Sequence, residues 1–301
     1  MQFSRVLKIA AVAMTLLHTQ AFAGLGDWVE FNIDNGQIKM PVTIEGVSAN
    51  AIIDSGAELS GINNAFLAAN GLSFDKGPKI KVKGADGSQT QASANGVPVN
   101  MFKAAFTVNE LVKADMGDAS DAVVLGSSFF RDFLLQIDYP NKRIRLLDKK
   151  AVNLNKLKNI DMRADRKTGS SIIKVALGGG EETWMLLDTG SQAGVVAKRD
   201  TAEENGWTKL PVDSSAVVKN VKVDTFRLPS MTFGPYNLEN VLAAIPAQGQ
   251  SLSNLENSIG NSPSFRGKRV NGLIGYDVLK NYVITMDYSK GRMHIGLPET
   301  I

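Results

Sequence analysis

The 301-residue sequence contains no cysteine, which excludes disulfides, thiol catalysis and cysteine-based metal sites. Histidine is almost as scarce. His18 lies close to the N-terminus, and His294 is the only other histidine. So few histidines argue against a histidine zinc site and against a Ser-His-Asp triad. We therefore expect neither a metal ion nor a cofactor.

Long apolar runs and an excess of one charge are also missing from most of the chain. No segment beyond the N-terminus is long and apolar enough to cross a bilayer, so we expect no stable membrane anchor. The 33 basic and 30 acidic residues leave a formal net charge of +3. No dense Lys/Arg patch accompanies this near balance, which argues against a nucleic-acid partner.

Residues 1–23 have the pattern of a secretory signal peptide. Arg5 and Lys8 precede an apolar run at 9–17, and residues 21–23 read Ala-Phe-Ala, an A-x-A cleavage site. An uncleaved N-terminal anchor is the alternative. An exported chain without cysteine is typical of a bacterial periplasm, which is the location that we expect.

The chain contains an internal repeat marked by two acidic triplets. Residues 51–57 read Ala-Ile-Ile-Asp-Ser-Gly-Ala, and residues 185–191 read Met-Leu-Leu-Asp-Thr-Gly-Ser. Each is followed by two apolar residues and a glycine, at 124–126 and 273–275. The triplets are 134 residues apart and the later glycines 149 apart, so the second half is longer between its landmarks. A polar stretch at 247–269, which we interpret as a mobile loop, accounts for the excess.

The repeat continues without a gap from 126–139 to 275–288. Each copy predicts a short helix, a strand, a tight turn and a last strand. Asp138 and Asp287 also recur, but each lies between a strand and a turn and is interpreted as a turn residue.

Most of the remaining pattern predicts strands. Residues 39–45 and 172–177 alternate before a turn, and the strands that follow, 49–53 and 183–187, end on the aspartates of the two triplets. Residues 79–99 predict a long hairpin with the tip Gly84, Ala85, Asp86 and Gly87. Residues 217–226 are its weaker counterpart, and 149–168 resemble a connection between halves.

Asp54 and Asp188 are the candidate catalytic residues. A carboxylate at the tip of an apolar strand is costly to bury unless it is paired or hydrogen-bonded. If the two tips meet on a pseudo-twofold axis, the carboxyl groups share one proton, because like charges that close cannot both ionise. The ionised group can then take a proton from water, while the protonated one polarises a substrate carbonyl.

Six neighbouring residues are predicted to support this pair. The hydroxyls of Ser55 and Thr189 can brace the opposite half. Glycine permits close backbone approach, so small residues are expected in the triplets and beneath them. The expected supporting residues are Ser55, Gly56, Thr189, Gly190, Gly126 and Gly275.

Together these motifs resemble the retropepsin-like aspartic proteases, with both halves fused in one chain as in pepsin-like enzymes. The resemblance covers nearly all of residues 36–297. It implies an all-β fold of two closed β-barrel lobes with an active-site cleft between them, and the hairpin tip as a substrate-binding flap. The implied division is a signal peptide (1–23), an N-terminal lobe (24–148), a linker (149–170) and a C-terminal lobe (171–301).

The same resemblance implies an aspartic endopeptidase that hydrolyses peptide or protein substrates. A chain that already contains both halves needs no partner, so we expect a monomer. Two alternatives stay open: a non-catalytic protein that holds a peptide or cell-wall fragment in the cleft, and a structural envelope protein without a ligand. Both aspartates are present, which favours the enzyme.

Overall fold

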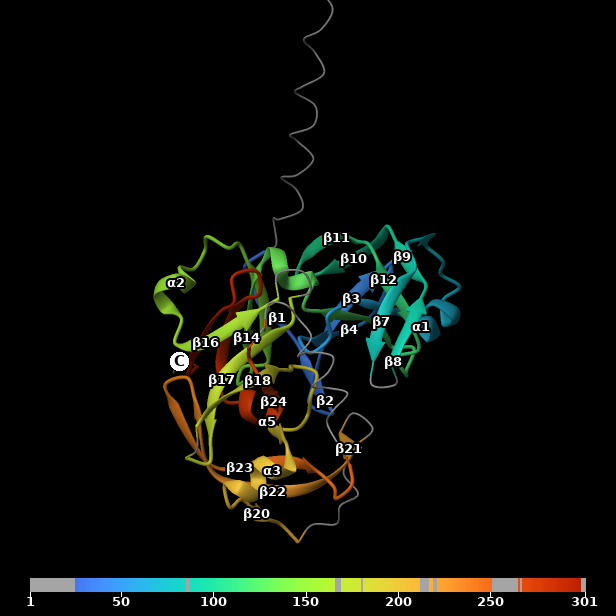
Figure 1. The fold of residues 1–301 in the computed structure, drawn as a ribbon. Coiled ribbons are helices and arrows are strands. Elements are labelled where there is room, and N and C mark those ends of the chain that lie inside the picture. The colour runs from blue at the N-terminus through green and yellow to red at the C-terminus, as the bar shows by residue number, and fades with distance from the viewer. Residues whose placement is uncertain are drawn as a thin grey trace, which may run out of the picture.

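The computed structural model in Figure 1 describes residues 25–84, 87–165, 169–179, 181–211, 217–218, 221–250, 265 and 267–298. The predicted signal peptide, residues 1–23, lies outside the described residues. Strands predominate in the described part and the helices are short, which confirms the predicted all-β class. The blue and cyan strands of the first half and the yellow and orange strands of the second form two lobes (Figure 1).

The first half is built from short strands joined by tight turns. Its helices are α1 (Asn64–Ala69) and the 3-10 helix η1 (Phe129–Asp132). Its strands are β1 (Val29–Glu30), β2 (Asn32–Asp34), β3 (Gln37–Ile44), β4 (Val47–Asp54), β5 (Gly61–Asn63), β6 (Asp75–Lys76), β7 (Ile80–Gly84), β8 (Gly87–Gln91), β9 (Ser93–Asn95), β10 (Val97–Met101), β11 (Ala104–Val108), β12 (Leu111–Ala114), β13 (Asp121–Gly126), β14 (Leu134–Asp138) and β15 (Arg143–Leu147).

The second half repeats this order with fewer and longer strands. Its helices are α2 (Leu154–Leu157), α3 (Arg199–Glu204) and α5 (Tyr276–Leu279). Its strands are β16 (Ile160–Ala164), β17 (Ser171–Leu177), β18 (Glu182–Leu187), β19 (Val195–Ala197), β20 (Thr208–Lys209), β21 (Val217–Val218), β22 (Val221–Phe233), β23 (Tyr236–Pro246), β24 (Val270–Ile274), β25 (Val283–Asp287) and β26 (Arg292–Gly296).

The predicted strands that lead to the two triplets are confirmed as β3 and β4 in the first half, and as β17 and β18 in the second. In each half the strand that leads to the aspartate pairs in the same way. β4 is antiparallel to β3 and parallel to β13, and β18 is antiparallel to β17 and parallel to β24. This shared pairing brings each aspartate to the carboxyl end of a strand inside its sheet.

One part of a 14-stranded sheet joins the two lobes. Its strands run in the order β1-β15-β14-β25-β26-β16, three strands of the first half followed by three of the second. At its centre Gln136 pairs with Thr285, its equivalent 149 residues later, and the Gln136 Nε2 donates to the Thr285 Oγ1 at 2.8 Å. On either side Leu135 pairs with Met286, and Ile137 with Ile284. Equivalent residues thus exchange partners about this pair, which places a pseudo-twofold axis there.

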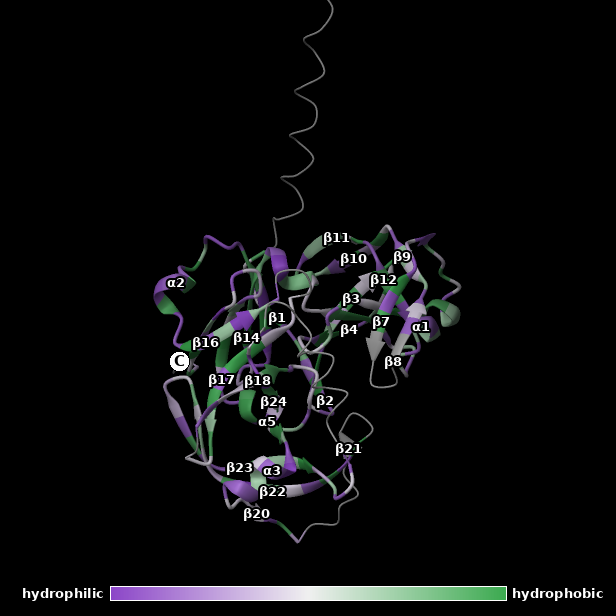
Figure 2. Ribbon diagram, viewed as in Figure 1, coloured by the Kyte–Doolittle hydropathy of each residue, from purple (hydrophilic) through white to green (hydrophobic). Residues whose placement is uncertain are grey.

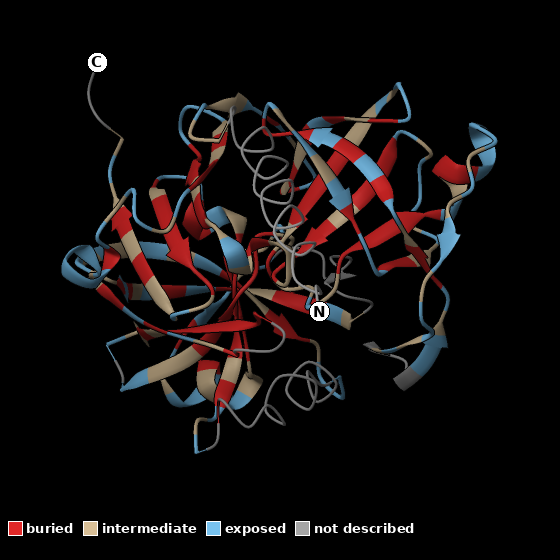
Figure 3. Ribbon diagram, turned by 90° about the horizontal axis from the view of Figure 1, so that it is seen from above, coloured by how far each residue is buried: buried red, intermediate tan, exposed pale blue. Residues whose placement is uncertain are grey.

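Hydrophobic residues form a core that continues from one half into the other. One contiguous cluster includes Ile53 and Phe130 from the first half and Leu187 and Tyr288 from the second. Figure 2 shows hydrophobic residues in green along the strands, and Figure 3 shows buried segments in red meeting between the lobes. The lobes therefore share buried surface beneath the two triplets.

The hairpin predicted over residues 79–99 is shorter in the structure. β7 and β8 form a separate two-stranded sheet in which Gly84 pairs with Gly87. The prediction is wrong for 93–99, because β9 pairs with β6 and β12, and β10 with β3 and β11. In β9 Ser93 and Ala94 are both buried, and β10 alternates buried and exposed side chains, so both strands belong to the lobe. The weaker counterpart is present where β21 pairs with the start of β22.

The expected linker contains regular secondary structure. The segment 149–170 carries α2 and β16, and β16 pairs with β17 and β26, so this part of the chain belongs to the sheets. The extra length of the second half lies mainly between β23 and β24, at 247–269, where the first half has only 115–120. Residues 251–264 and 266, most of the predicted mobile loop, lie outside the described residues.

Candidate active site

The two acidic triplets form tight turns at the ends of β4 and β18. The Asp54 Oδ1 accepts hydrogen bonds from the backbone amides of Gly56 at 2.9 Å and Ala57 at 3.1 Å. In the second turn the Gly190 amide donates to the Asp188 Oδ1 at 3.0 Å. Amide donors stabilise the charged carboxylate and orient it relative to its own turn.

The structure brings Asp54 and Asp188 together. A Cβ atom added to Gly56 would lie 2.5 Å from the Cγ of Asp188, and one added to Gly190 would lie 2.5 Å from the Cγ of Asp54. Each carboxylate therefore lies against the glycine of the opposite triplet. A larger residue in place of either glycine would overlap that carboxylate. Asp188 is fully buried, whereas Asp54 is partly exposed. The two carboxyl groups therefore meet where the two halves join, and Asp54 is the more accessible to solvent.

Ser55 and Thr189 tie the two turns to each other. The Ser55 amide donates to the Thr189 Oγ1, and the Thr189 amide donates to the Ser55 Oγ, both at 2.9 Å. The Ser55 hydroxyl also donates to the Leu187 carbonyl at 2.9 Å, and the Thr189 hydroxyl to the Ile53 carbonyl at 3.0 Å. All four bonds are buried and cross between the halves, so each hydroxyl braces the other half's strand.

Gly126 and Gly275 make room for the turns above them. A Cβ on Gly126 would lie 2.5 Å from the Leu59 carbonyl oxygen, and one on Gly275 would lie 2.4 Å from that of Ala193. A side chain at either place would push the acidic turn away from its support. These two glycines thus have the packing role that their sequence position suggested.

Two further contacts between the halves were not found by sequence reasoning. Gly36, in the turn before β3, has φ +77°, and a Cβ there would lie 2.4 Å from the Gln192 Cα. Ser170, in the turn before β17, donates to the Glu58 Oε1 at 3.0 Å. Glu58 and Gln192 are each four residues after their aspartate, and this shared position is the signal that could have identified them.

Two tyrosines lie buried beneath the paired turns and were also not singled out from the sequence. Tyr139 and Tyr288 directly follow β14 and β25, 149 residues apart, and both are almost inaccessible to solvent. Burial raises the pKa of each phenol well above its ordinary value. For Tyr288 the Ser55 hydroxyl acts in the opposite direction, and the Asp54 charge raises the pKa further.

The other candidate residues lie apart from the acidic turns. Gly84 and Gly87 close the β7–β8 hairpin, while Ala85 and Asp86 lie outside the described residues. Asp138 accepts hydrogen bonds from Asn141, and Asp287 from Ser289. These two aspartates are turn residues, as the sequence indicated.

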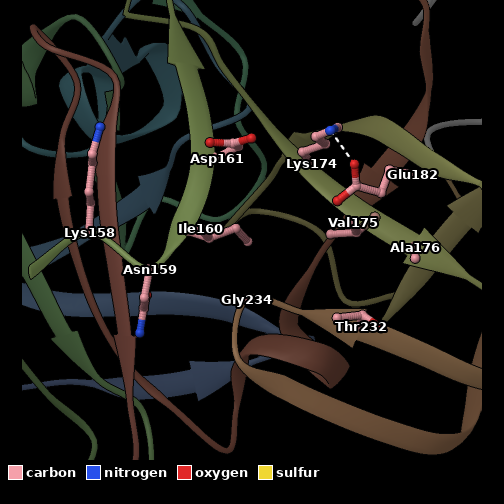
Figure 4. Close-up of a pocket in the computed structure, with 10 residues that line it drawn as sticks. All are labelled: Lys158, Asn159, Ile160, Asp161, Lys174, Val175, Ala176, Glu182, Thr232 and Gly234. Carbon is pink, nitrogen blue, oxygen red and sulfur yellow. Dashed lines mark ion pairs between the residues drawn. The ribbon is translucent and has the colours of Figure 1, made fainter.

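Two cavities occupy equivalent places in the halves and contain no candidate catalytic residue. One, of about 420 Å³, lies between β16, β17 and the β22–β23 turn, and the Lys174–Glu182 ion pair spans part of its wall (Figure 4). The other, of about 720 Å³, is lined by β1, β3, β4 and the β10–β11 turn. Since equivalent elements line both, these cavities follow from the repeated fold.

Comparison with known families agrees with this geometry. The aspartyl protease family matches residues 40–129 and 173–278, one match in each half and together more than half of the chain. No curated protein matches the sequence significantly. The two matched regions contain both acidic triplets and both later glycines. The chain belongs to the aspartyl protease family.

Proposed function

We propose that the protein is an aspartic endopeptidase that hydrolyses peptide bonds with a water molecule activated between Asp54 and Asp188. One observation carries this proposal: each carboxylate lies against the glycine of the opposite triplet. Two acidic groups held at one junction can divide the roles of base and acid.

In the proposed reaction, the ionised carboxylate takes a proton from the water, and the water oxygen attacks the carbonyl carbon of the substrate. The protonated carboxyl group gives its proton to the carbonyl oxygen, which leaves a neutral tetrahedral diol. The carboxyl group that took the proton of the water then gives a proton to the amide nitrogen, while the other carboxylate takes the proton of one diol hydroxyl. The C–N bond breaks, which yields a free carboxyl group and a free amine. The pair ends with one proton, as it began. Because either carboxyl group can carry the shared proton, neither is assigned a fixed role.

The surrounding contacts supply the rigidity that such chemistry needs. The hydrogen bonds between Ser55 and Thr189 hold the two turns in one arrangement, and Gly126 and Gly275 let them rest on the strands below. Preorganised groups lower the barrier because they need not rearrange during the reaction. We place the substrate between the lobes, under the β7–β8 hairpin, where a free strand edge can pair with an extended peptide.

We further propose that the chain is exported, is cleaved after Ala23 and acts as a monomer in the periplasm. The A-x-A site supports cleavage, and the fusion of both halves supports a monomer. In the described part of the chain, no helix is long and apolar enough to cross a bilayer. N-terminal sequencing of the exported protein tests the cleavage site, and a product that still begins at Met1 would refute it.

The catalytic proposal is tested by incubating the purified mature protein with an unbiased peptide library from acidic to neutral pH. We expect cleavage by the wild type and none by Asp54→Asn or Asp188→Asn, since an amide cannot replace either member of the pair. Asp75→Asn is the control, because Asp75 is exposed on β6. Full activity in either single variant would disprove the pair. Peptide binding without cleavage would favour the non-catalytic alternative.

A further inference from the structure

A small pocket lies where the segment that follows β15 meets the turn between β25 and β26. Its volume is about 230 Å³. Leu134 and Leu154, which are buried in one apolar cluster, form part of its lining. The lining also includes three cationic side chains, those of Lys149, Lys150 and Arg292. The pocket therefore brings together cations from the segment between the halves and from the second half.

Arg292 lacks the ion pair that its equivalent makes in the first half. Arg143, which is 149 positions earlier, lies opposite Asp138 on the neighbouring strand, and its Nε donates to the Asp138 Oδ2 at 2.7 Å. Arg292 lies opposite Asp287 in the same way. Among the described residues, however, no hydrogen bond or ion pair engages the Arg292 guanidinium. Its N–H donors are therefore available to a ligand in the pocket.

The local sequence accounts for this difference between the halves. Asp287 accepts at its Oδ1 from the Ser289 amide at 3.0 Å, from the Ser289 hydroxyl at 2.7 Å and from the Lys290 amide at 3.1 Å. The first half has Pro140 in place of Ser289, and proline has neither an amide hydrogen nor a hydroxyl. Asp287 thus has donors in its own turn that Asp138 lacks, and the arginine opposite it is left for another partner.

The two lysines add positive charge to the pocket. The Lys149 ammonium donates to the Ser289 hydroxyl at 2.7 Å and to the Arg131 carbonyl, and both acceptors are uncharged. Lys150 is exposed, and no ion pair engages either ammonium group in the part of the chain that the structure describes. The lining has one carboxylate, that of Asp287, against three cations, which leaves two positive charges without a counter-charge.

We propose that this pocket binds a phosphate group, either as inorganic phosphate or as the phosphate monoester headgroup of a lipid. Such a group carries a charge of about −1.5 to −2 at pH 7, which matches the two unbalanced positive charges. An arginine fork fits two phosphate oxygens at once, and a lysine ammonium adds a point charge. The pocket is smaller than the range of about 300–1,000 Å³ that is typical of sites for larger ligands, which suits a single phosphate group.

The start of α2 offers one further donor. The Asn153 Oδ1 accepts from the Lys156 amide at 3.3 Å, so the Nδ2 of Asn153 remains a donor at the pocket. A bound phosphate would then link the segment after β15 to β26 of the second half. Because it binds the folded chain, it should stabilise that chain by mass action. This site does not depend on the proposed peptidase function.

Calorimetric titration of the mature wild type with sodium phosphate, at constant ionic strength, tests the site. We expect saturable binding at one site with a Kd of about 1 mM, as for a few charge-assisted hydrogen bonds at a partly open pocket. The thermal unfolding midpoint should rise as phosphate is added. Arg292→Gln should raise the Kd about tenfold or more, because it removes the fork that no residue of the chain can replace.

Lys290→Gln is the matched control. Lys290 is exposed in the same turn and does not line the pocket, and its substitution removes the same unit of charge. We expect it to change the Kd less than about twofold, as for a solvent-screened surface charge. Without phosphate, Arg292→Gln should unfold within a few degrees of the wild type, since it loses no described side-chain partner. Equal weakening by the two variants would indicate diffuse attraction to a basic surface and would overturn the proposal.

Vesicles distinguish the two sources of the phosphate group. We would sediment the protein with phosphatidylcholine vesicles that contain or lack phosphatidic acid, whose headgroup is a phosphate monoester. Binding that requires phosphatidic acid, is lost in Arg292→Gln and is kept in Lys290→Gln would support the lipid headgroup. Binding of inorganic phosphate alone would support the free anion. If neither probe binds in a manner that depends on Arg292, the proposal is wrong.

Discussion

At the residue scale, the two acidic turns differ by one methyl group at the position that joins them. Ser55 and Thr189 make reciprocal bonds with nearly equal lengths, so the hydroxyl carries the connection in both halves. Both side chains are fully buried, and a buried polar group that loses its partner carries the full cost of its desolvation.

We predict that Ser55→Ala and Thr189→Ala each lower the free energy of unfolding by about 1–3 kcal/mol, because each leaves a buried amide and a buried carbonyl without a partner. Urea denaturation measures this change. Thr189→Ser is the matched control: it keeps the hydroxyl and should lose only about 0.8 kcal/mol, the contribution of one buried methyl group. Alanine variants as stable as Thr189→Ser would contradict the bracing role.

At the element scale, the halves differ most in the hairpin that follows α1 in the first half and α3 in the second. In the first half β7 and β8 form a small sheet of their own, whereas in the second half β21 pairs only with the start of the long strand β22. A hairpin outside the main sheets can move without disturbing the core. The first half therefore has the better candidate for a flap.

We predict that replacing Gly84 and Gly87 together by proline raises KM about tenfold or more and leaves the fold intact. Proline fixes φ and removes the amide donor at a tip where the two glycines pair. The main sheets contain neither residue, so the thermal unfolding midpoint should stay within a few degrees of the wild type, as for a surface change. Peptide cleavage kinetics and circular dichroism measure the two effects. Unchanged kinetics would rule out this hairpin as the flap and make residues 247–269 the next candidate.

At the scale of the whole molecule, the two lobes are joined too extensively to behave as separate units. In the six strands from β1 to β16, β14 of the first half pairs with β25 of the second, and one hydrophobic cluster contains residues of both halves. Exposing the core of one half would also expose buried residues of the other.

We therefore predict a single cooperative unfolding transition for the mature chain. Differential scanning calorimetry should give equal calorimetric and van't Hoff enthalpies, the criterion for two-state behaviour. Two resolved transitions, one for each half, would show that the shared sheet and core do not couple the lobes.

Much of this organisation was readable in the sequence because it depends on local pattern. Alternating apolar residues identified β3 and β17, and the apolar runs before the two triplets identified β4 and β18. The repeated glycines at 126 and 275 established the correspondence of the halves. The span of the first hairpin was misjudged at 93–99, since alternation alone does not reveal whether a strand pairs with its neighbour or with a distant partner.

The sequence by itself determined the two acidic triplets, their matching contexts and the all-β repeat, because these are properties of residues close together in the chain. Only the tertiary structure decided which groups meet across the axis: Asp188 against Gly56, Gln192 against Gly36, and Ser55 against Thr189. Those contacts join residues more than 130 positions apart. They depend on the register of β14 against β25, which the packing of both halves sets and no local pattern specifies.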